Sequence, residues 1–370
     1  MATGFVWHET YMWHDTGSGV AFLEPGGFLQ PDEHVESPES KRRFRNLLEV
    51  SGLLEELVAV APRPASRLEL ERVHSPDHVE RVAALSAEHG GLAGDEAPFG
   101  PGGFEIAALA AGGVLAAVEA VLAGEIDNAY ALVRPPGHHA MADQGFGFCI
   151  FNNGAVAAAH LIESLGAERV AIVDWDAHHG NGAQGIFWDD PRVLTVSIHQ
   201  DGAFPPGSGS WDETGGPGAA GTNLNLPMPP GTGVGGYSAA FERVIVPALE
   251  RFAPDFILVA CGFDPGPQDP LARLMVHSDG FREMTARVRE CAERICDGRL
   301  ALFHEGGYSR AYVPFCGLAV VEALSGIDSG VQDPFLKGYA GFPYQSLQPL
   351  QESVIERAET QIGETRKGDE

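Results

Sequence analysis

Acidic residues and a histidine with metal-binding character follow two apolar segments of this sequence. Asp176 and His178 come shortly after the run 170–173, and Asp264 ends the run 256–263. Short apolar runs rich in Val and Ile that end in polar residues are typical of buried parallel strands, whose carboxyl ends bind ligands. Two carboxylates and one imidazole can hold Zn²⁺ and leave a coordination position open. Carboxylates also tolerate Fe²⁺ or Co²⁺, so the native metal stays open.

Tandem histidines and a tyrosine follow two further apolar segments. His138 and His139 come after a rigid Pro-Pro-Gly turn, which places two imidazoles at a strand end. Tyr308 follows a Gly-Gly pair after the run 300–303. Because four apolar segments each end in residues suited to proton or metal chemistry, we expect these residues to form one active site.

The elements that must position these residues alternate along the chain. Apolar runs predict strands at 129–133, 170–173, 193–198, 256–263 and 300–303. Helical patterns cover 40–57, 106–122, 156–165 and 237–251. This alternation predicts a mostly parallel sheet with helices on both faces. The Gly/Pro-rich stretches 97–103 and 205–230 are interpreted as active-site loops, and 348–370 as a surface helix with a frayed tail.

Length and composition set broad bounds on function. The chain has 370 residues, a net charge of −27 at pH 7 and five cysteines. The acidic balance argues against a duplex-DNA binder and suits cationic ligands, or simply solubility. An odd number of cysteines without a scaffold-like spacing fits a reducing compartment, and the N-terminus lacks a signal-peptide pattern. We expect no membrane-spanning run and a cytoplasmic protein.

Six sequence blocks, in order along the chain, resemble the histone deacetylase superfamily, in particular its bacterial class II-like amidohydrolases. The blocks are 134–139 (Arg-Pro-Pro-Gly-His-His), 147–153, 174–181, 262–264, 269–271 and 305–308 (Glu-Gly-Gly-Tyr). The resemblance spans roughly residues 1–325. It implies an arginase-like three-layer α/β/α fold with a mostly parallel central sheet of about eight strands. It also implies a single domain over residues 1–370, with a helical tail near 345–370.

The resemblance further implies one zinc ion and hydrolysis of an N-acetyl-lysine-type amide. The implied zinc ligands are Asp176, His178 and Asp264, and the implied catalytic residues are His138, His139, Tyr308, Asp174 and Asn181. Asp174 is expected to hydrogen-bond His138, and Asn181 to face His139. Because an amide cannot stabilise an imidazolium as a carboxylate does, His139 is expected to remain neutral more easily. Which histidine is the principal base stays open.

Tyr308 is expected to donate its hydroxyl to the amide carbonyl oxygen. The implied substrate channel consists of Phe148, Phe204, Leu271, Gly147 and Gly306. Polyamine-directed relatives carry a carboxylate at the rim position that Leu271 occupies here. Leu271 therefore favours acetyl-lysine peptides or other N-acyl amines as substrates.

A K⁺ ion beneath the zinc is also implied, with oxygens of Asp174, Asp176, His178 and Ser197 as ligands. Pro265 departs from the family pattern, which usually has a small residue after the ligand Asp264, so the local loop is expected to differ. Bacterial relatives imply a homodimer or homotetramer.

Alternative functions remain beside the deacetylase hypothesis. An acetylpolyamine amidohydrolase would share the metal chemistry; the acidic composition favours it and Leu271 opposes it. An arginase-like ureohydrolase needs more carboxylates to hold two Mn²⁺, and the tandem histidines and Tyr308 argue against it. A catalytically silent acetyl-lysine-binding protein is disfavoured because every expected catalytic position is filled. The physiological substrate and the preferred acyl group stay open.

Overall fold

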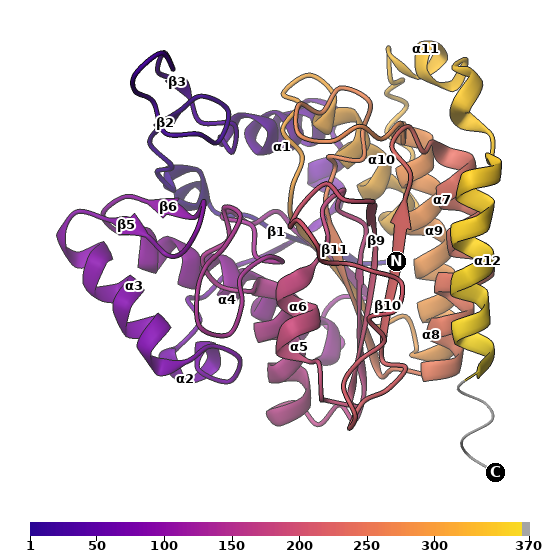
Figure 1. Cartoon of the computed structure of the whole chain (residues 1–370), viewed down its shortest axis with the longest axis horizontal. Coiled ribbons are helices and arrows are strands. Elements are labelled where there is room, and N and C mark those ends of the chain that lie inside the picture. Colours follow the sequence, from indigo (N-terminus) through magenta and orange to yellow (C-terminus); the bar gives the residue numbers. More distant parts are fainter. Residues whose placement is uncertain (365–370) are drawn as a thin grey trace.

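A central sheet of eight parallel strands lies between two layers of helices in the computed structural model, which describes residues 1–364 (Figure 1). The strand order is β10-β9-β8-β11-β12-β7-β1-β4. The strands are β1 (Thr3–Val6), β4 (Val58–Val60), β7 (Asn128–Ala131), β8 (Val170–Asp174), β9 (Val193–Gln200), β10 (Asn223–Met228), β11 (Phe256–Cys261) and β12 (Leu300–His304). The predicted parallel α/β architecture is therefore confirmed.

One face of the sheet is covered by α4 and α5, and the other by α1, α7, α8, α9 and α10, with α12 outermost (Figure 1). The helices are α1 (Glu39–Val50), α2 (Arg67–Leu70), α3 (Pro76–Glu88), α4 (Gly103–Leu122), α5 (Asn153–Glu163), α6 (Asn181–Ile186), α7 (Val234–Ala240), α8 (Val246–Phe252), α9 (Ser278–Ile295), α10 (Val313–Ser325), α11 (Leu336–Ala340) and α12 (Pro349–Glu364). Short 3₁₀ turns occupy Glu9–Trp13, Leu53–Glu56 and Pro343–Gln345. Two small antiparallel pairs, β2 (Ser18–Gly19) with β3 (Asp32–Glu33) and β5 (Gly91–Leu92) with β6 (Pro98–Phe99), lie outside the main sheet.

Side chains of the central strands divide between two hydrophobic cores. In β8, Val170 and Ile172 pack with the core that includes α4 and α5. Ala171 and Val173 pack into the core on the opposite face. Successive side chains of a strand point to opposite faces, so a strand buried on both sides reads as a continuous apolar run. This explains why β8 and β11 were recognisable from the sequence.

Several predicted boundaries were wrong for local reasons. The helix predicted at 40–57 ends at Val50, because Gly52 takes a left-handed conformation (φ 80°) before the 3₁₀ turn. The helix predicted at 237–251 is longer, since α7 and α8 are joined by a π-helical turn, Phe241–Ile245. The loop predicted at 205–230 contains the edge strand β10. In 97–103, residues form β6 and the start of α4 instead of an active-site loop.

Helix α4 corrects the expectation that no segment is long and apolar enough for a membrane. Among the described residues, α4 (20 residues, mean hydropathy 1.8) meets that criterion by length and composition. Its apolar window is 78% buried inside the protein, where it packs against α5, β7 and β1. Core helices of globular proteins pass the same test.

Helix α12 matches the helical part of the tail predicted at 348–370. It contacts the edge strand β10 and the π-helical turn, and it buries Ile355 and Ala358. The helix is therefore part of the fold rather than a loosely attached surface element. The frayed end predicted for this tail falls on residues 365–370, outside the described residues.

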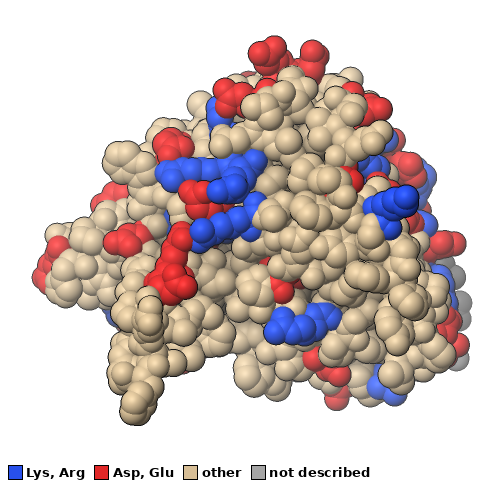
Figure 2. Space-filling view, turned by 90° about the horizontal axis from the view of Figure 1, so that it is seen from above, with Lys and Arg blue, Asp and Glu red and all other residues tan. Residues whose placement is uncertain are grey.

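Charged side chains of both signs are mixed on the face shown in Figure 2. Lys and Arg side chains lie there in small groups beside Asp and Glu, and much of the face is uncharged. Several surface arginines are ion-paired, for example Arg42 with Glu9 and Arg192 with Asp190. On this face the described residues do not form the continuous basic tract that a duplex-DNA binder needs.

Candidate active site

The predicted site residues converge at the carboxyl ends of four neighbouring strands. Strands β8, β11, β12 and β7 are adjacent in the sheet, and all run in the same direction. Asp176 and His178 follow β8, Asp264 follows β11, Tyr308 follows β12 and the tandem histidines follow β7. Ligands of open α/β sheets bind at this edge, so the fold brings the four separate motifs together.

Asp176, His178 and Asp264 form one buried group of potential metal ligands. The Nδ1 of His178 lies 3.1 Å from Oδ1 of Asp176 and 2.9 Å from Oδ2 of Asp264. Backbone N–H groups hold the carboxylates in place: Gly306 donates to Asp176 (2.8 Å) and Ala177 donates to Asp264 (2.7 Å). The three side chains therefore converge on one point, as a shared metal site requires.

The electrostatics of this group fit a divalent cation. Burial disfavours a charged imidazole, but the carboxylates of Asp264 and Asp176 outweigh that effect and raise the pKa of His178 well above its usual value. The two carboxylates thus compete for one positive charge on the imidazole between them. A divalent cation can take the place of that proton, and the donor set of two carboxylates and one imidazole is one that zinc accepts.

Pro265 does not displace the preceding ligand. Its carbonyl accepts a hydrogen bond from the backbone of Val276 (3.0 Å), which holds the loop after β11. The carboxylate of Asp264 still reaches both His178 and the backbone of Ala177.

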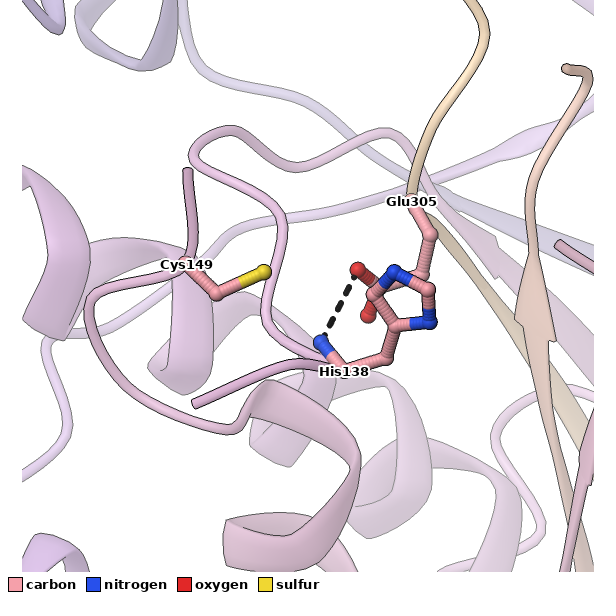
Figure 3. Close-up of side chains that lie close together, drawn as sticks. All are labelled: His138, Cys149 and Glu305. Atoms are coloured by element: carbon pink, nitrogen blue, oxygen red, sulfur yellow. Dashed lines mark hydrogen bonds between the residues drawn. The ribbon is translucent and has the colours of Figure 1, made fainter. Parts of the chain in front are cut away.

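Two other groups of potential ligands occur among the described residues. Glu69, Glu119 and His160 form one of them. Arg63 already binds both carboxylates, at 2.7 Å from Glu69 and 2.6 Å from Glu119, so this group reads as a structural ion network. The other consists of His138, Cys149 and Glu305, drawn in Figure 3. Burial raises the pKa of the Cys149 thiol well above its usual value, which disfavours the thiolate that binds metals.

The tandem histidines have different hydrogen-bond partners. Nδ1 of His138 lies 2.9 Å from Oδ2 of Asp174, and Nδ1 of His139 lies 2.7 Å from Oδ1 of Asn181. The two ring centroids are 3.9 Å apart. These are the pairings expected from the sequence. In each ring the orienting partner binds Nδ1 and not Nε2.

The same partners separate the pKa values of the two rings. Burial opposes an imidazolium at His138, but Asp176 and Asp174 outweigh it and raise the pKa of His138 to about 10. Burial and the neighbouring His138 and His178 lower the pKa of His139 well below its usual value. The expectation that His139 stays neutral more easily agrees with this asymmetry.

A buried ion cluster of Arg134, Glu36 and Lys41, which the sequence analysis missed, lies at the start of the histidine loop. Arg134 is fully buried and its guanidinium lies 2.8 Å from the carboxylate of Glu36, which also binds Lys41 at 2.9 Å. Arg134 precedes the loop in the chain, and its peptide bond to Pro135 is cis. The motif Arg-Pro-Pro-Gly-His-His signalled the loop, but its partner Glu36 lies 98 residues away in the sequence.

A pocket of about 220 Å³ opens over these residues. Its lining consists of Phe22, Glu96, His139, Gly147, Phe148, His178, Ala203, Phe204, Leu271 and Tyr308. All the predicted channel residues except Gly306 are present, and the sequence analysis missed Phe22 and Glu96. A larger hollow of about 390 Å³ between β10, α8 and α12 lacks such converging catalytic groups.

Backbone geometry holds the aromatic walls of the pocket. Gly147 and Phe148 both have positive φ (49° and 70°). A Cβ on Gly147 would lie 2.7 Å from the His139 ring and 2.8 Å from the Phe204 ring, so only glycine fits there. Phe204 stacks on Phe146, with centroids 5.0 Å apart, and Phe148 meets the ring of Tyr308 edge-on at 5.9 Å.

Gly306 contributes beneath the pocket rather than to its wall. A Cβ at Gly306 would lie 2.4 Å from the carboxylate of Asp264 and 2.5 Å from that of Asp176. Gly306 therefore leaves space for the carboxylates of Asp264 and Asp176, the candidate metal ligands.

Tyr308 is anchored by its backbone and held as a neutral phenol. Its N–H donates to Oδ2 of Asp269 (2.8 Å), and Ser40 donates to the carbonyl of Gly307 (2.9 Å). Burial, followed by the carboxylates of Asp264 and Asp176, raises the pKa of Tyr308 well above its usual value. The hydroxyl therefore stays protonated and can donate a hydrogen bond in the pocket that His178 also lines.

Ser197 lies on β9, in register with Asp174 of β8. Its hydroxyl accepts from the backbone N–H of Gly180 at 3.4 Å and bonds Nδ1 of His199 at 2.9 Å. The structure thus places Ser197 on the strand next to Asp174, and the implied K⁺ site stays a prediction.

The fold and this site are those of a deacetylase-like α/β protein, and comparisons with known proteins identify the family. Residues 34–324 match the histone deacetylase domain. The chain is 50% identical to the histone deacetylase-like amidohydrolase of Pseudomonas aeruginosa, over 98% of this chain and 96% of that protein. It is 38% identical to a probable deacetylase of Archaeoglobus fulgidus, over 90% of this chain and 89% of the relative.

A solved structure agrees. The crystal structure of the HDA15 HD domain superposes with a TM-score of 0.85 at 29% identity, covering 100% of this chain and 99% of that one. The chain belongs to the histone deacetylase family and is a hydrolase of the deacetylase class.

Proposed function

We propose that this protein is a zinc-dependent amidohydrolase that removes acetyl, or a related acyl group, from N-acyl-lysine-type substrates. The observation that carries the proposal is the convergence on one pocket of three kinds of group. These are the buried Asp176–His178–Asp264 set, the tandem histidines and the phenol of Tyr308. The family match supports the reaction class, and the geometry supports the distribution of roles.

The residues of the chain divide the chemistry between them. A zinc ion held by Asp176, His178 and Asp264 would supply a Lewis acid and lower the pKa of water to about 7. His138 and His139 would take a proton from the attacking water and deliver one to the leaving amine. The Tyr308 hydroxyl would donate to the carbonyl oxygen as negative charge develops on it.

The pocket suits a narrow aliphatic chain. Phe148 and Phe204 both line it, and its volume of about 220 Å³ is below the range of roughly 300–1,000 Å³ that drug-sized ligands occupy. The methylene stem of a lysine can pack between the two rings, while the bulky peptide stays outside.

Replacing Tyr308 with Phe tests the mechanism. Loss of the hydroxyl should lower kcat roughly 100- to 1,000-fold, as for one oxyanion donor. Zinc content, measured by elemental analysis, should remain that of the wild type because Tyr308 is not a ligand. Tyr344→Phe, on an exposed side chain (63% accessible), is the matched control. Full activity of Tyr308→Phe would remove the phenol from the mechanism.

An acetylpolyamine amidohydrolase is the second candidate, and one observation keeps it in view. Glu96, an exposed acidic residue, lines the pocket, whereas Leu271, which also lines it, carries no charge. Turnover of an acetyl-lysine peptide and of acetylputrescine, measured side by side on zinc-loaded protein, separates the two. Preference for acetylputrescine would mean that Glu96 outweighs Leu271 as the determinant of substrate choice. A catalytically silent acetyl-lysine binder predicts turnover of neither.

We also propose a K⁺ ion bound by oxygens of Asp174, Asp176, His178 and Ser197, supported by the pairing of β8 with β9. Measuring activity in K⁺ and after replacement of K⁺ by Na⁺ or Li⁺ would test this site, and a loss of activity on replacement would support it. A homodimer or homotetramer is proposed as the assembly, and sedimentation measurements would test it. A cytoplasmic location is proposed because all five cysteines are buried and unpaired, which fits a reducing compartment. The mixed surface charge supports a partner other than nucleic acid.

A further inference from the structure

Glu305 is a buried carboxylate that the proposed reaction does not use. It follows directly after β12 and is fully buried. Its Oε2 accepts hydrogen bonds from two consecutive backbone N–H groups, those of Gly137 (2.7 Å) and His138 (3.1 Å). Its Oε1 has no hydrogen-bond partner within residues 1–364. A carboxylate buried in this way is costly unless it is well hydrogen-bonded, so its presence needs an explanation.

The surroundings of Glu305 point to the catalytic loop. Figure 3 shows the carboxylate lying against the ring of His138, with the Cys149 side chain directed toward the same space. The Cys149 thiol donates to the carbonyl of Gly147 (3.4 Å) and remains neutral, since burial raises its pKa. The carboxyl group of Glu305 is thus held by the two backbone N–H groups of the histidine loop, which both donate to its Oε2.

Glu305 also connects the histidine loop to the other parts of the site. Its own N–H donates to the carbonyl of Cys261 (3.2 Å), the last residue of β11, which leads to Asp264. The N–H of the next residue, Gly306, donates to the metal-ligating Asp176 (2.8 Å). Tyr308 follows two residues later. One short segment therefore contacts the metal ligands, carries the phenol and binds the amides of the proton-transfer loop.

The carbonyl side of the histidine loop has separate supports. Asn152 and Gly182 donate to the carbonyl of His138, at 3.4 Å and 3.0 Å. Loss of the Glu305 acceptor would therefore leave the loop attached through its carbonyl, while its amide side would be free to shift. The expected consequence is a displaced imidazole in a folded protein.

We infer that Glu305 is a positioning residue, which fixes the His138 imidazole relative to the metal ligands by accepting the N–H groups of Gly137 and His138. The inference rests on the proposed function, because it requires His138 to act in proton transfer. A misplacement of about 1 Å in a catalytic group can lower turnover about 100-fold. Substrate affinity should change little, because Glu305 does not line the pocket.

Three substitutions separate acceptor geometry from charge. Glu305→Gln keeps an oxygen at the same reach. Because burial already raises the pKa of Glu305 to about 8, a neutral acceptor at this position should keep kcat within about tenfold of the wild type. Glu305→Ala removes the acceptor and should lower kcat about 100-fold with KM unchanged. Glu305→Asp keeps the carboxyl group but withdraws it by one methylene group, so its kcat should also fall at least about tenfold. Zinc content and thermal midpoint are measured for each variant.

Glu322→Ala is the matched control. Glu322, on α10, is another buried carboxylate, and it binds Arg282 (2.6 Å) and the backbone N–H of Ser329 (3.0 Å). This end of α10 meets the amino end of β7, where Asn128 donates to the carbonyl of Leu324, and not the carboxyl ends that carry the site. Its loss should lower the thermal midpoint and leave kcat of the folded protein unchanged. A general loss of stability therefore cannot imitate the result expected for Glu305.

The outcomes are decisive for the inference. Wild-type kcat in Glu305→Ala, or in Glu305→Asp if Ala does not fold, would overturn it. So would a Glu305→Gln variant as slow as Glu305→Ala, or a rise in KM in place of a fall in kcat. The proposed function fails separately, if the zinc-loaded wild type hydrolyses neither acyl-lysine peptides nor acetylputrescine.

Discussion

Replacing Gly306 with Ala should weaken the proposed metal site while leaving the fold intact. The added Cβ would lie 2.4 Å from Oδ2 of Asp264 and 2.5 Å from Oδ2 of Asp176, where ordinary contact begins at 3.4 Å. Gly306 has no positive φ, so Ala introduces no backbone strain there. The substitution therefore acts on the two carboxylates alone.

The magnitude follows from the required displacement. Each carboxylate oxygen must withdraw by about 1 Å, whereas zinc–ligand distances tolerate deviations of roughly 0.2 Å. Both oxygens face the same new methyl group, and neighbouring backbone N–H groups limit their freedom to move. We expect zinc affinity to fall roughly 100-fold, the upper end of the range for a disturbed ligand shell, or about 3 kcal/mol.

Zinc titration against a competing chromophoric chelator measures this change directly, independent of turnover. The control is Gly185→Ala in α6, where a Cβ meets no atom within 4 Å. It should retain wild-type affinity. If Gly306→Ala bound zinc as tightly as the wild type, Asp176 and Asp264 would not be the rigid ligand pair described above.

Three further outcomes are expected. The imidazole of His74 is held neutral, with burial lowering its pKa to about 3, so its stabilising contribution is complete above the unfolded pKa of 6.5. That contribution to the free energy of unfolding should be lost as the pH falls from 6.5 toward 3, by about 1 kcal/mol per pH unit. In urea unfolding measured across this pH range, His74→Gln should therefore lose stability less steeply than the wild type. Parallel curves for the two proteins would contradict this. Leu271→Glu should raise kcat/KM for acetylputrescine relative to an acetyl-lysine peptide at least about tenfold, because the new carboxylate can form an ion pair with the distal ammonium. An unchanged ratio would show that position 271 does not contact that ammonium. Glu36→Gln leaves two buried cations without their carboxylate, so the free energy of unfolding should drop by roughly 3–5 kcal/mol, and a drop below about 1 kcal/mol would show that other groups compensate.

The candidate site residues could be picked out from the sequence because they follow runs buried on both faces of the sheet. In β8 and β11 every residue is buried, so the strands stand out as apolar segments and their ends mark the site. By contrast, β1 and β4 were not predicted. They have only four and three residues, and β4 is largely exposed at the edge of the sheet.

The supports of the site could not be predicted in the same way. Glu305 binds an amide 168 residues earlier in the chain, and Glu36 binds a guanidinium 98 residues later. Such pairs depend on which loops meet above the sheet, and no local periodicity records that. Glu96 reaches the pocket because its carbonyl accepts a backbone hydrogen bond from Phe148 (2.7 Å). This contact does not depend on the Glu96 side chain, so the residue type could not predict its position.

The division of side chains between two cores has a consequence for how the chain tolerates changes in length. Within β8, adding or removing one residue would move the side chains that follow to the opposite face of the sheet and turn Asp174 away from His138. The length of this strand is therefore fixed by the site at its carboxyl end. The connections that enter β8 and β11 at the opposite edge, near residues 164–169 and 253–255, carry no catalytic group. We therefore expect changes in length to be tolerated better there, provided that Asp255 still accepts the N–H groups of Glu168 (2.8 Å) and Arg169 (2.9 Å).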